Sequence, residues 1–277
     1  MSVTRRRVLY AIGKHSLLIG VAFLFVAPFA FVLLTALMTD HQALSRALWP
    51  HPIRWSNFGD IFTQTRLLRW TWNTTLVAGL SSLGVVVSCV PVAYALSRLQ
   101  WRGRQVAFVL VLSTMMLPVQ VTIIPLFVIF SHLHWIGSLK PLIVPSFFGD
   151  AFSIFLLRQF LLTIPQDLTD AGRIDGASEW RLLVRVVAPL ARPAITAVFI
   201  FNFLYNWNDL FAPLLYLATH PESYTLSLGL SEFRSQRHVN WELIMAASLV
   251  FTLPVTALFF AAQKVFVEGI TVTGVKG

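Results

Sequence analysis

Long apolar runs, each about as long as a bilayer is thick, constrain this chain more than any other feature of its sequence. Of the 277 residues, 56% are hydrophobic and only 12% are charged, and the hydrophobic residues fall into extended blocks. A helix of about 20 apolar residues spans the hydrocarbon core of a membrane. An average soluble domain has about a quarter of its residues charged. The sequence therefore predicts an all-α integral membrane protein.

The blocks predict six transmembrane helices, near residues 16–38, 72–96, 106–130, 140–161, 193–218 and 243–264. Pro118 and Pro125 lie within the third stretch, so we expect a kink there. The first block follows a basic tail, as in a secretory signal, but it is long enough to span and lacks a clear cleavage site, so we expect it to be retained. The expected organisation is a tail, first helix and external loop at 1–71, a five-helix core at 72–266 with a connector at 163–192, and a tail at 267–277.

Lysine and arginine are unevenly distributed over the predicted connectors. With the N-terminus inside, 14 of the 21 lie on one side of the membrane and 7 on the other. The positive-inside rule therefore predicts that both termini are cytoplasmic, although the charged external loop at 39–69 weakens the contrast. The net charge of +9 is spread over several connectors rather than gathered on one aromatic-rich face, so we expect a lipid bilayer and no nucleic acid as a partner.

The connector at 163–192 has the pattern of two short helices around a turn. Pro165 suits the first turn of a helix, Gly176 can take a positive φ, Ser178 can cap the second helix, and Pro189 can help to end it. Helices of this length are marginal in water, so their apolar side chains must pack on something. These positions are Leu168, Ala171, Trp180, Leu183 and Val187. The spacing leaves two alternatives open, another protein or the inner membrane surface.

Polar side chains within the predicted spans suggest two further sites. Asn202, Asn206 and Asp209 recur at i, i+4 and i+7, so they share one face of the fifth span. This face either lines a pathway or forms hydrogen bonds between helices, and the spacing slightly favours the second. Asp150 follows a glycine and is expected to cap a helix that begins at Ala151, while a place in the pathway or a titrating role stays open.

Tryptophans near the predicted span ends suggest anchoring at the membrane interface. The residues in question are Trp70, Trp72, Trp135 and Trp241. Indole rings favour the headgroup region because one edge is polar and the body is apolar. We therefore assign them no contact with a solute.

The connector also resembles a known signature. The segment Asp170-Ala171-Gly172, followed after two residues by Asp175-Gly176-Ala177-Ser178, is similar to the loop of binding-protein-dependent ABC importer permeases. That loop is usually Glu-Ala-Ala, three residues and Gly, with an apolar run that ends in Leu-Pro. This sequence departs from it with Asp170 for Glu, Gly172 for Ala, and Pro189 before rather than after Leu190.

The resemblance covers nearly the whole chain. Other segments that look like the sugar-importing branch are Ala93–Leu99 with Trp101–Arg104, Phe155–Phe160, Trp207-Asn208 with Pro213-Leu214, and the tail from Gly269 to Gly277. Each piece is short, but they occur in order and at plausible spacing. Within that branch the chain most resembles the six-span, maltose-type second permease subunit.

The resemblance implies a type I ABC importer permease fold in a bacterial or archaeal inner membrane. It also implies a second homologous permease, two ATPase subunits and an external solute-binding protein as partners. The residues that the resemblance assigns to ATPase coupling are Asp170, Ala171, Gly172, Asp175, Gly176, Ala177, Ser178 and Trp180. In this interpretation residues 166–187 sit in a groove of the ATPase subunit, and Asn202, Asn206, Asp209 and Asp150 are possible residues of the translocation path.

The sequence has no Gly-x-x-x-x-Gly-Lys-Ser/Thr loop and no motif of a catalytic or metal site. We therefore expect a transport subunit that is not an enzyme and binds no cofactor, with ATP and Mg²⁺ held by the ATPase partners. The resemblance points to a sugar, in particular an oligosaccharide, and the lack of a central Lys or Arg in the spans favours a neutral solute. Glycerol-3-phosphate or a polyol remains the alternative solute, and a secondary transporter or an intramembrane enzyme the alternative class.

Overall fold

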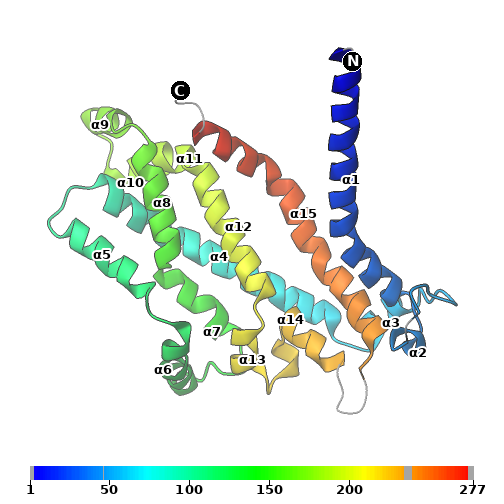
Figure 1. Ribbon diagram of the computed structural model, residues 1–277. Coiled ribbons are helices and arrows are strands. Elements are labelled where there is room, and N and C mark those ends of the chain that lie inside the picture. Colours follow the sequence, from blue (N-terminus) through cyan, green and yellow to red (C-terminus); the bar gives the residue numbers. More distant parts are fainter. Residues whose placement is uncertain (1–2, 46, 234–238, 274–277) are drawn as a thin grey trace. The chain divides into compact units, whose positions relative to one another are not determined.

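The computed structural model describes residues 3–45, 47–233 and 239–273, and helices dominate this part of the chain (Figure 1). The long helices are α1 (Val3–Ala36), α4 (Leu67–Arg98), α8 (Ala151–Thr163), α12 (Arg192–Asn208) and α15 (Trp241–Thr273). Four of the 21 lysines and arginines counted above lie outside the described residues, namely Arg46, Arg234, Arg237 and Lys276, as does the part of the predicted tail from Gly274 onward.

Shorter helices connect the long ones. They are α2 (Asp40–Ala43), α3 (Asn57–Thr63), α5 (Arg104–Thr114), α6 (Val119–His132), α7 (Lys140–Ile143), α9 (Asp167–Ile174), α10 (Glu179–Leu182), α11 (Ala188–Leu190), α13 (Phe211–Leu217) and α14 (Leu226–Gly229). Short 3-10 turns occupy Val144–Phe148, Pro221–Ser223 and Leu230–Phe233, and a π-helical turn occupies Leu183–Val187.

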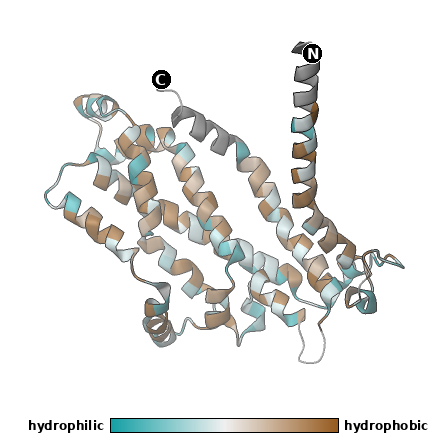
Figure 2. Cartoon of the chain, viewed as in Figure 1, coloured by the Kyte–Doolittle hydropathy of each residue, from teal (hydrophilic) through white to brown (hydrophobic). Residues whose placement is uncertain are grey.

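Four helical segments in the described chain are long and apolar enough to cross a membrane. These are Ile12–Ala36, Leu67–Arg98, Lys140–Thr163 and Trp241–Gln263. A fifth is obtained if Glu179–Leu190 and Arg192–Asn208, which meet at an angle of 79°, count as one bent span. Apolar residues predominate on α8, α12 and α15, with a hydrophilic patch on α8, whereas polar residues gather at α9 and the turn between α4 and α5 (Figure 2). The all-α membrane fold is therefore confirmed, and the orientation of the termini stays a prediction.

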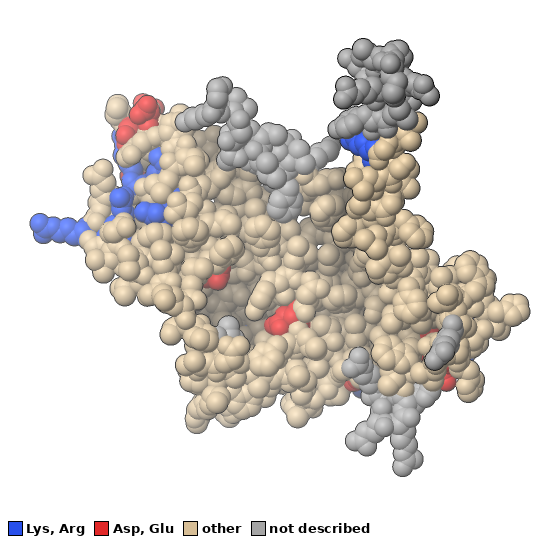
Figure 3. All heavy atoms as spheres, viewed as in Figure 1, with Lys and Arg blue, Asp and Glu red and all other residues tan. Residues whose placement is uncertain are grey.

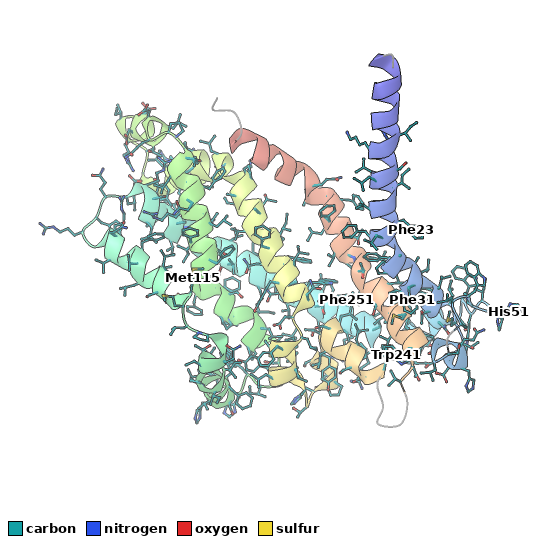
Figure 4. The ribbon with its side chains drawn as sticks, viewed as in Figure 1. Phe23, Phe31, His51, Met115, Trp241 and Phe251 are labelled. Carbon is teal, nitrogen blue, oxygen red and sulfur yellow. The ribbon has the colours of Figure 1, made fainter. Side chains whose placement is uncertain are left out.

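The stretch that we expected as one kinked span is divided into two helices. α5 ends at Thr114, and α6 begins only after Pro118, whose backbone is extended with ψ 136°. Met115 marks the point where the chain leaves α5 (Figure 4). Proline has no N–H for the helix ladder and disfavours helical backbone at the residue before it. The break is therefore complete at Pro118, while Pro125 is accommodated inside α6.

Two compact units can be distinguished by their internal contacts, and we describe each by itself. The first unit comprises residues 1–67 and 230–254. Within it, the buried Asn57 on α3 donates its Nδ2 to the carbonyls of Ala36 at 2.9 Å and Met38 at 2.8 Å. This side chain closes the C-terminal end of α1, where helical carbonyls have no partner in the helix itself.

The second unit comprises residues 68–229 and 255–277 and contains two apolar clusters along α4. One cluster joins α4, α5, α8, α12 and the π-helical turn, with Cys89, Leu157, Val187 and Val198 among its buried members. The other joins the earlier part of α4 to α6, α7, α13 and α14. Leu183 and Val187 of the connector are thus part of the core.

Trp70 near the start of α4 is fully buried rather than placed at an interface, so that sequence prediction is wrong. Its indole Nε1 donates to the carbonyl of Pro221 at 3.2 Å, and a Cβ at Gly229 would lie only 2.3 Å from its ring. The neighbouring Asn73 donates to the carbonyls of Glu222 and Tyr224, both at 3.0 Å. Packing against residues 221–229 determines the place of Trp70, which the local sequence does not show.

Candidate functional site

The candidate site is the connector between α8 and α12, and its first helix ends in a well-defined turn. The N–H of Gly176 donates to the carbonyl of Arg173, and that of Ala177 to the carbonyl of Gly172, both at 3.0 Å. Gly176 has φ +79°, a conformation that side chains with a Cβ rarely adopt. This is the Schellman ending of a helix, in which a glycine reverses the chain. The predicted role of Gly176 in the turn is confirmed.

The second helix begins where the sequence predicts. Ser178 is the N-cap of α10, and its Oγ accepts from the N–H of Arg181 at 3.4 Å. The helical run continues through the π-helical turn and α11 to Leu190, one residue beyond Pro189. The 79° bend into α12 follows directly, at Ala191. The connector and α12 are therefore joined by a single residue, Ala191.

The two faces of the connector have different surroundings. Leu182, Leu183 and Val187 are buried in the second unit. Ile174 and Trp180, in contrast, are 87% and 66% exposed. Leu168 is also exposed, as is Ala171. Of the five apolar positions predicted to pack, Leu183 and Val187 therefore pack on this chain, and the other three are exposed. Ile174 is a further exposed apolar residue, which was not predicted from the sequence.

An ionic network joins the connector to α4. Arg173 donates from Nη1 to Asp170 Oδ1 at 2.6 Å and from Nε to Glu179 Oε1 at 2.7 Å. The hydroxyl of Tyr94 on α4 donates to Glu179 Oε2 at 2.5 Å. The hydrogen bonds from Arg173 lower the pKa of the Glu179 carboxyl, and the same bonds raise the pKa of Arg173. Both groups are therefore charged near neutral pH.

A second tether holds the point where the connector begins. The guanidinium of Arg98, which is 95% buried at the end of α4, donates to the carbonyls of Leu161 and Ile164. These carbonyls belong to the last turn of α8 and its cap, and that of Leu161 also accepts from the N–H of Ile164 at 3.3 Å. An open cavity of about 690 Å³ lies beside this tether and the ionic network.

Gly172 is explained by packing inside this chain. A Cβ at this position would lie 2.4 Å from Cδ2 of the buried Leu182. The close approach of α9 to α10 therefore favours glycine here, because a larger residue would have to displace the Leu182 side chain. The other residues that the resemblance assigns to coupling are exposed or partly exposed: Asp170, Ala171, Asp175, Gly176, Ala177, Ser178 and Trp180. Their proposed role in coupling stays a prediction.

Asp150 is the N-cap of α8, as the sequence predicts. Its Oδ2 accepts from the N–H of Ser153 at 2.7 Å, and the helix begins at Ala151. The backbone before it runs through Gly149, which has φ +99°. An N-cap carboxylate satisfies a helical amide and is favoured by the helix dipole. Asp150 therefore has a structural partner within the span.

The three polar residues predicted to share a face of the fifth span form different kinds of hydrogen bond. Asn202 Nδ2 donates to Ser153 Oγ at 3.2 Å and joins α12 to α8. Asn206 donates to the carbonyl of Asn202 at 2.8 Å, within the same helix. Asp209 Oδ1 accepts from the N–H groups of Phe211 and Ala212 at 2.9 and 3.3 Å, at the start of α13. The hydrogen bond of Asn202 is the inter-helix contact that the sequence favoured.

A neighbouring stripe of α12 is more exposed than the predicted one. Phe201, Tyr205 and Asn208 are all exposed, and Tyr205 is 70% exposed. They recur at i, i+4 and i+7, so this stripe is turned by one residue from the predicted one. The sequence alone did not reveal this exposed stripe, because aromatic residues in a membrane span are usually expected to face lipid or the protein core. Among the described residues, no group of three His, Cys, Asp or Glu lies together for a metal.

Comparisons with known proteins agree with this geometry. Residues 88–272 match the family described as binding-protein-dependent transport system inner membrane component. The arabinooligosaccharides transport system permease protein AraQ of Bacillus subtilis (strain 168) is 32% identical, over 97% of this chain and 96% of that protein. The lactose transport system permease protein LacG of Rhizobium radiobacter is 28% identical, over 97% and 98% of the two chains.

Solved structures show the same fold. A chain of a bacterial ABC transporter involved in the import of the acidic polysaccharide alginate aligns with a TM-score of 0.81 and 22% identity, over 95% of this chain and 98% of that chain. The similarity that we found in the sequence is thereby confirmed. The chain belongs to the family of binding-protein-dependent transport system inner membrane components.

Proposed function

We propose that this chain is the permease subunit of an ATP-driven importer of a sugar, in particular an oligosaccharide. A second permease subunit would complete the path, two ATPase subunits would hydrolyse ATP, and an external binding protein would deliver the solute. The observation that carries the proposal is the connector, which is anchored to the membrane helices on one face and leaves Ile174 and Trp180 uncovered on the other.

The charges of α9 favour a protein rather than the inner membrane surface as the cover for this outer face. Asp167 and Asp170 lie in its first turn, and Asp175 follows its end. Helices that lie on anionic membranes carry Lys and Arg on the polar face, and acidic groups are repelled there. Two large apolar side chains beside acidic groups are typical of a protein interface with a hydrophobic centre and a polar rim. We therefore assign this face to the ATPase subunit.

The tethers supply a route for coupling. Arg98 holds the beginning of the connector to α4 and α8, Glu179 holds its middle to Tyr94, and its end continues into α12 across the 79° bend. A shift of the ATPase subunit would thus move the ends of three membrane helices together. Rigid-body movement of this kind is a common means of switching between two states.

The solute assignment is supported by the relatives and by the exposed face of α12. AraQ and LacG are named for arabinooligosaccharide and lactose transport. Tyr205 offers an apolar ring face and a hydroxyl, and Asn208 an amide, which together suit the apolar faces and hydroxyls of a sugar. Beyond Arg192 in its first turn, α12 carries no Lys or Arg that would favour a phosphorylated solute.

The ATPase activity of the assembled transporter tests the proposal. Trp180→Glu places a charge on the outer face of the connector and is expected to reduce solute-stimulated ATP hydrolysis at least tenfold. Trp49→Glu is the matched control, since Trp49 is 69% exposed but lies in the loop after α2. Normal stimulation in Trp180→Glu would contradict the coupling role. Solute uptake that persists without the ATPase partner would instead favour a secondary transporter.

A further inference from the structure

Four arginines surround the turn between α4 and α5. Arg98 ends α4, Arg102 is exposed in the turn, Arg104 begins α5, and Arg158 projects from the adjacent α8. Within the described residues, none of the four lies within 4.0 Å of a carboxylate. Of the acidic groups on the nearby connector, Asp170 and Glu179 are paired with Arg173. Asp167 and Asp175 are exposed and form no ion pair with a described residue. Lys and Arg atoms accordingly gather at this end of the second unit (Figure 3).

The contacts of these arginines orient them without neutralising their charge. Arg104 Nη1 donates to the carbonyl of Leu99 and Arg158 Nε to that of Leu96, both at 3.1 Å. The guanidinium carbon of Arg158 lies 3.9 Å from the ring centre of Phe108. Carbonyl oxygens and aromatic rings carry no net charge. The patch therefore stays positive, and the charges of Arg104 and Arg158 repel each other.

A hollow of about 370 Å³ opens beside the patch. Trp101 and Arg104 line it, together with Gln100, Gly103, Gln105 and Val106. The indole Nε1 of Trp101 donates to the carbonyl of Ala95 at 3.2 Å, so the ring is held in place while it remains partly exposed. From the hollow, α5 continues into a face of exposed apolar side chains at Val106, Val109 and Leu110.

We propose that this surface binds an anionic phospholipid. The guanidinium groups of Arg102 and Arg104 would hold the headgroup phosphate, and the apolar face of α5 would hold the acyl chains. Three observations favour this occupant: uncompensated positive charge at a helix end, a fixed indole beside it, and an apolar face that continues from it. Cations and tryptophan at the ends of spans mark the headgroup level, and guanidinium groups bind phosphate bidentately.

The position of this surface links the lipid to the connector. Arg98 holds the carbonyls of Leu161 and Ile164, where the connector begins, and it lies four residues before Arg102. A lipid bound at the turn would reduce the local repulsion among the arginines. It would thereby stabilise the end of α4 on which the connector is held.

The test compares the purified transporter in nanodiscs of phosphatidylcholine alone with nanodiscs that also contain phosphatidylglycerol. Native mass spectrometry measures phosphatidylglycerol retained on this chain. We expect Arg102→Gln with Arg104→Gln to weaken retention about 25-fold, since each cation near an anionic surface contributes about a factor of five. Arg66→Gln with Arg69→Gln at the opposite end of α4 is the matched control and is expected to retain the lipid.

Two further variants keep the result interpretable. Arg102→Lys with Arg104→Lys keeps the charge and is expected to restore most of the retention. Arg102→Gln alone removes one exposed side chain and is expected to weaken retention about fivefold if the double variant does not fold. Equal retention by the wild type and the double variant would overturn the proposal. No preference of the wild type for phosphatidylglycerol would also overturn it, and would indicate that protein covers this surface.

Discussion

Arg173 Nε lies 2.7 Å from Glu179 Oε1, and this ion pair joins the two short helices of the connector across their turn. The same carboxylate accepts from the hydroxyl of Tyr94 on α4 at 2.5 Å. One carboxylate therefore contributes both to the shape of the connector and to its attachment to α4.

Glu179→Gln should loosen the connector in a pH-dependent manner. The folded carboxyl has a pKa below its ordinary value near 4.5, so the ion pair stabilises the protein fully above that value. The contribution disappears as the pH falls through the lower folded pKa. Because both groups are partly exposed, we expect at most about 1 kcal/mol. Thermal unfolding of wild type and variant should differ at pH 7, and the difference should shrink as the pH falls below the ordinary carboxyl pKa. A difference that stays the same over this range would contradict this account.

Gly172→Ala, which restores the usual signature residue, should destabilise this protein. The added Cβ would lie 2.4 Å from Leu182 Cδ2, and overpacking of this kind costs about 1–3 kcal/mol. Adding Leu182→Val should recover part of the loss, which unfolding of the four proteins in a double-mutant cycle measures. Gly79→Ala is the control, since a Cβ there meets nothing within 4 Å. If the effects of the two substitutions on stability are additive, the Leu182 side chain is not what makes a Cβ at residue 172 unfavourable.

Asp150 can be tested by separating its charge from its hydrogen bond. Asp150→Asn removes the charge but keeps a side chain that caps helices well, so we expect uptake close to that of the wild type. Asp150→Ala removes the cap and should cost about 0.5–2 kcal/mol of stability. Uptake measured in proteoliposomes decides between the two roles. If Asp150→Asn abolishes uptake while the protein stays folded, the charge acts in transport and the capping account is insufficient.

Asn202 and Tyr205 should respond differently although they lie within one turn of α12. Asn202→Ala removes the bond to Ser153 Oγ and should lower stability by about 0.6–2 kcal/mol, as should Ser153→Ala, with little further loss in the double variant. Tyr205→Ala should leave stability nearly unchanged and alter the solute range, because its side chain is 70% exposed. Stability loss in Tyr205→Ala with unchanged transport would exclude it from the path.

Local backbone rules explain what the sequence predicted correctly. The positive φ of Gly176, the cap at Ser178 and the cap at Asp150 each depend on a residue and its immediate neighbours. The apolar blocks likewise predicted the long helices, because spanning a bilayer requires a length that is visible in any one segment. Of the six predicted spans, four are long and apolar enough in the described chain, or five with the bent pair, and the block at 106–130 is divided into α5 and α6.

Features that depend on packing between distant segments could not be predicted in this way. Trp70 is buried by residues 221–229, and Leu182 determines the need for Gly172. Leu183 and Val187 have the same apolar character as Ile174, but only the first two face the core. The sequence therefore indicated which positions of the connector must pack, and the structure shows where each one lies.

Cross-linking of the connector to the ATPase subunit tests the central claim most directly. Cysteine is introduced at Ile174 or Trp180 in the assembled transporter, and Trp49→Cys serves as the equally exposed control. We predict that a short bifunctional reagent joins the first two variants to the ATPase subunit, with a yield that changes on ATP binding, and does not join the control. Transport-competent complexes in which neither Ile174→Cys nor Trp180→Cys reaches the ATPase subunit would contradict the account.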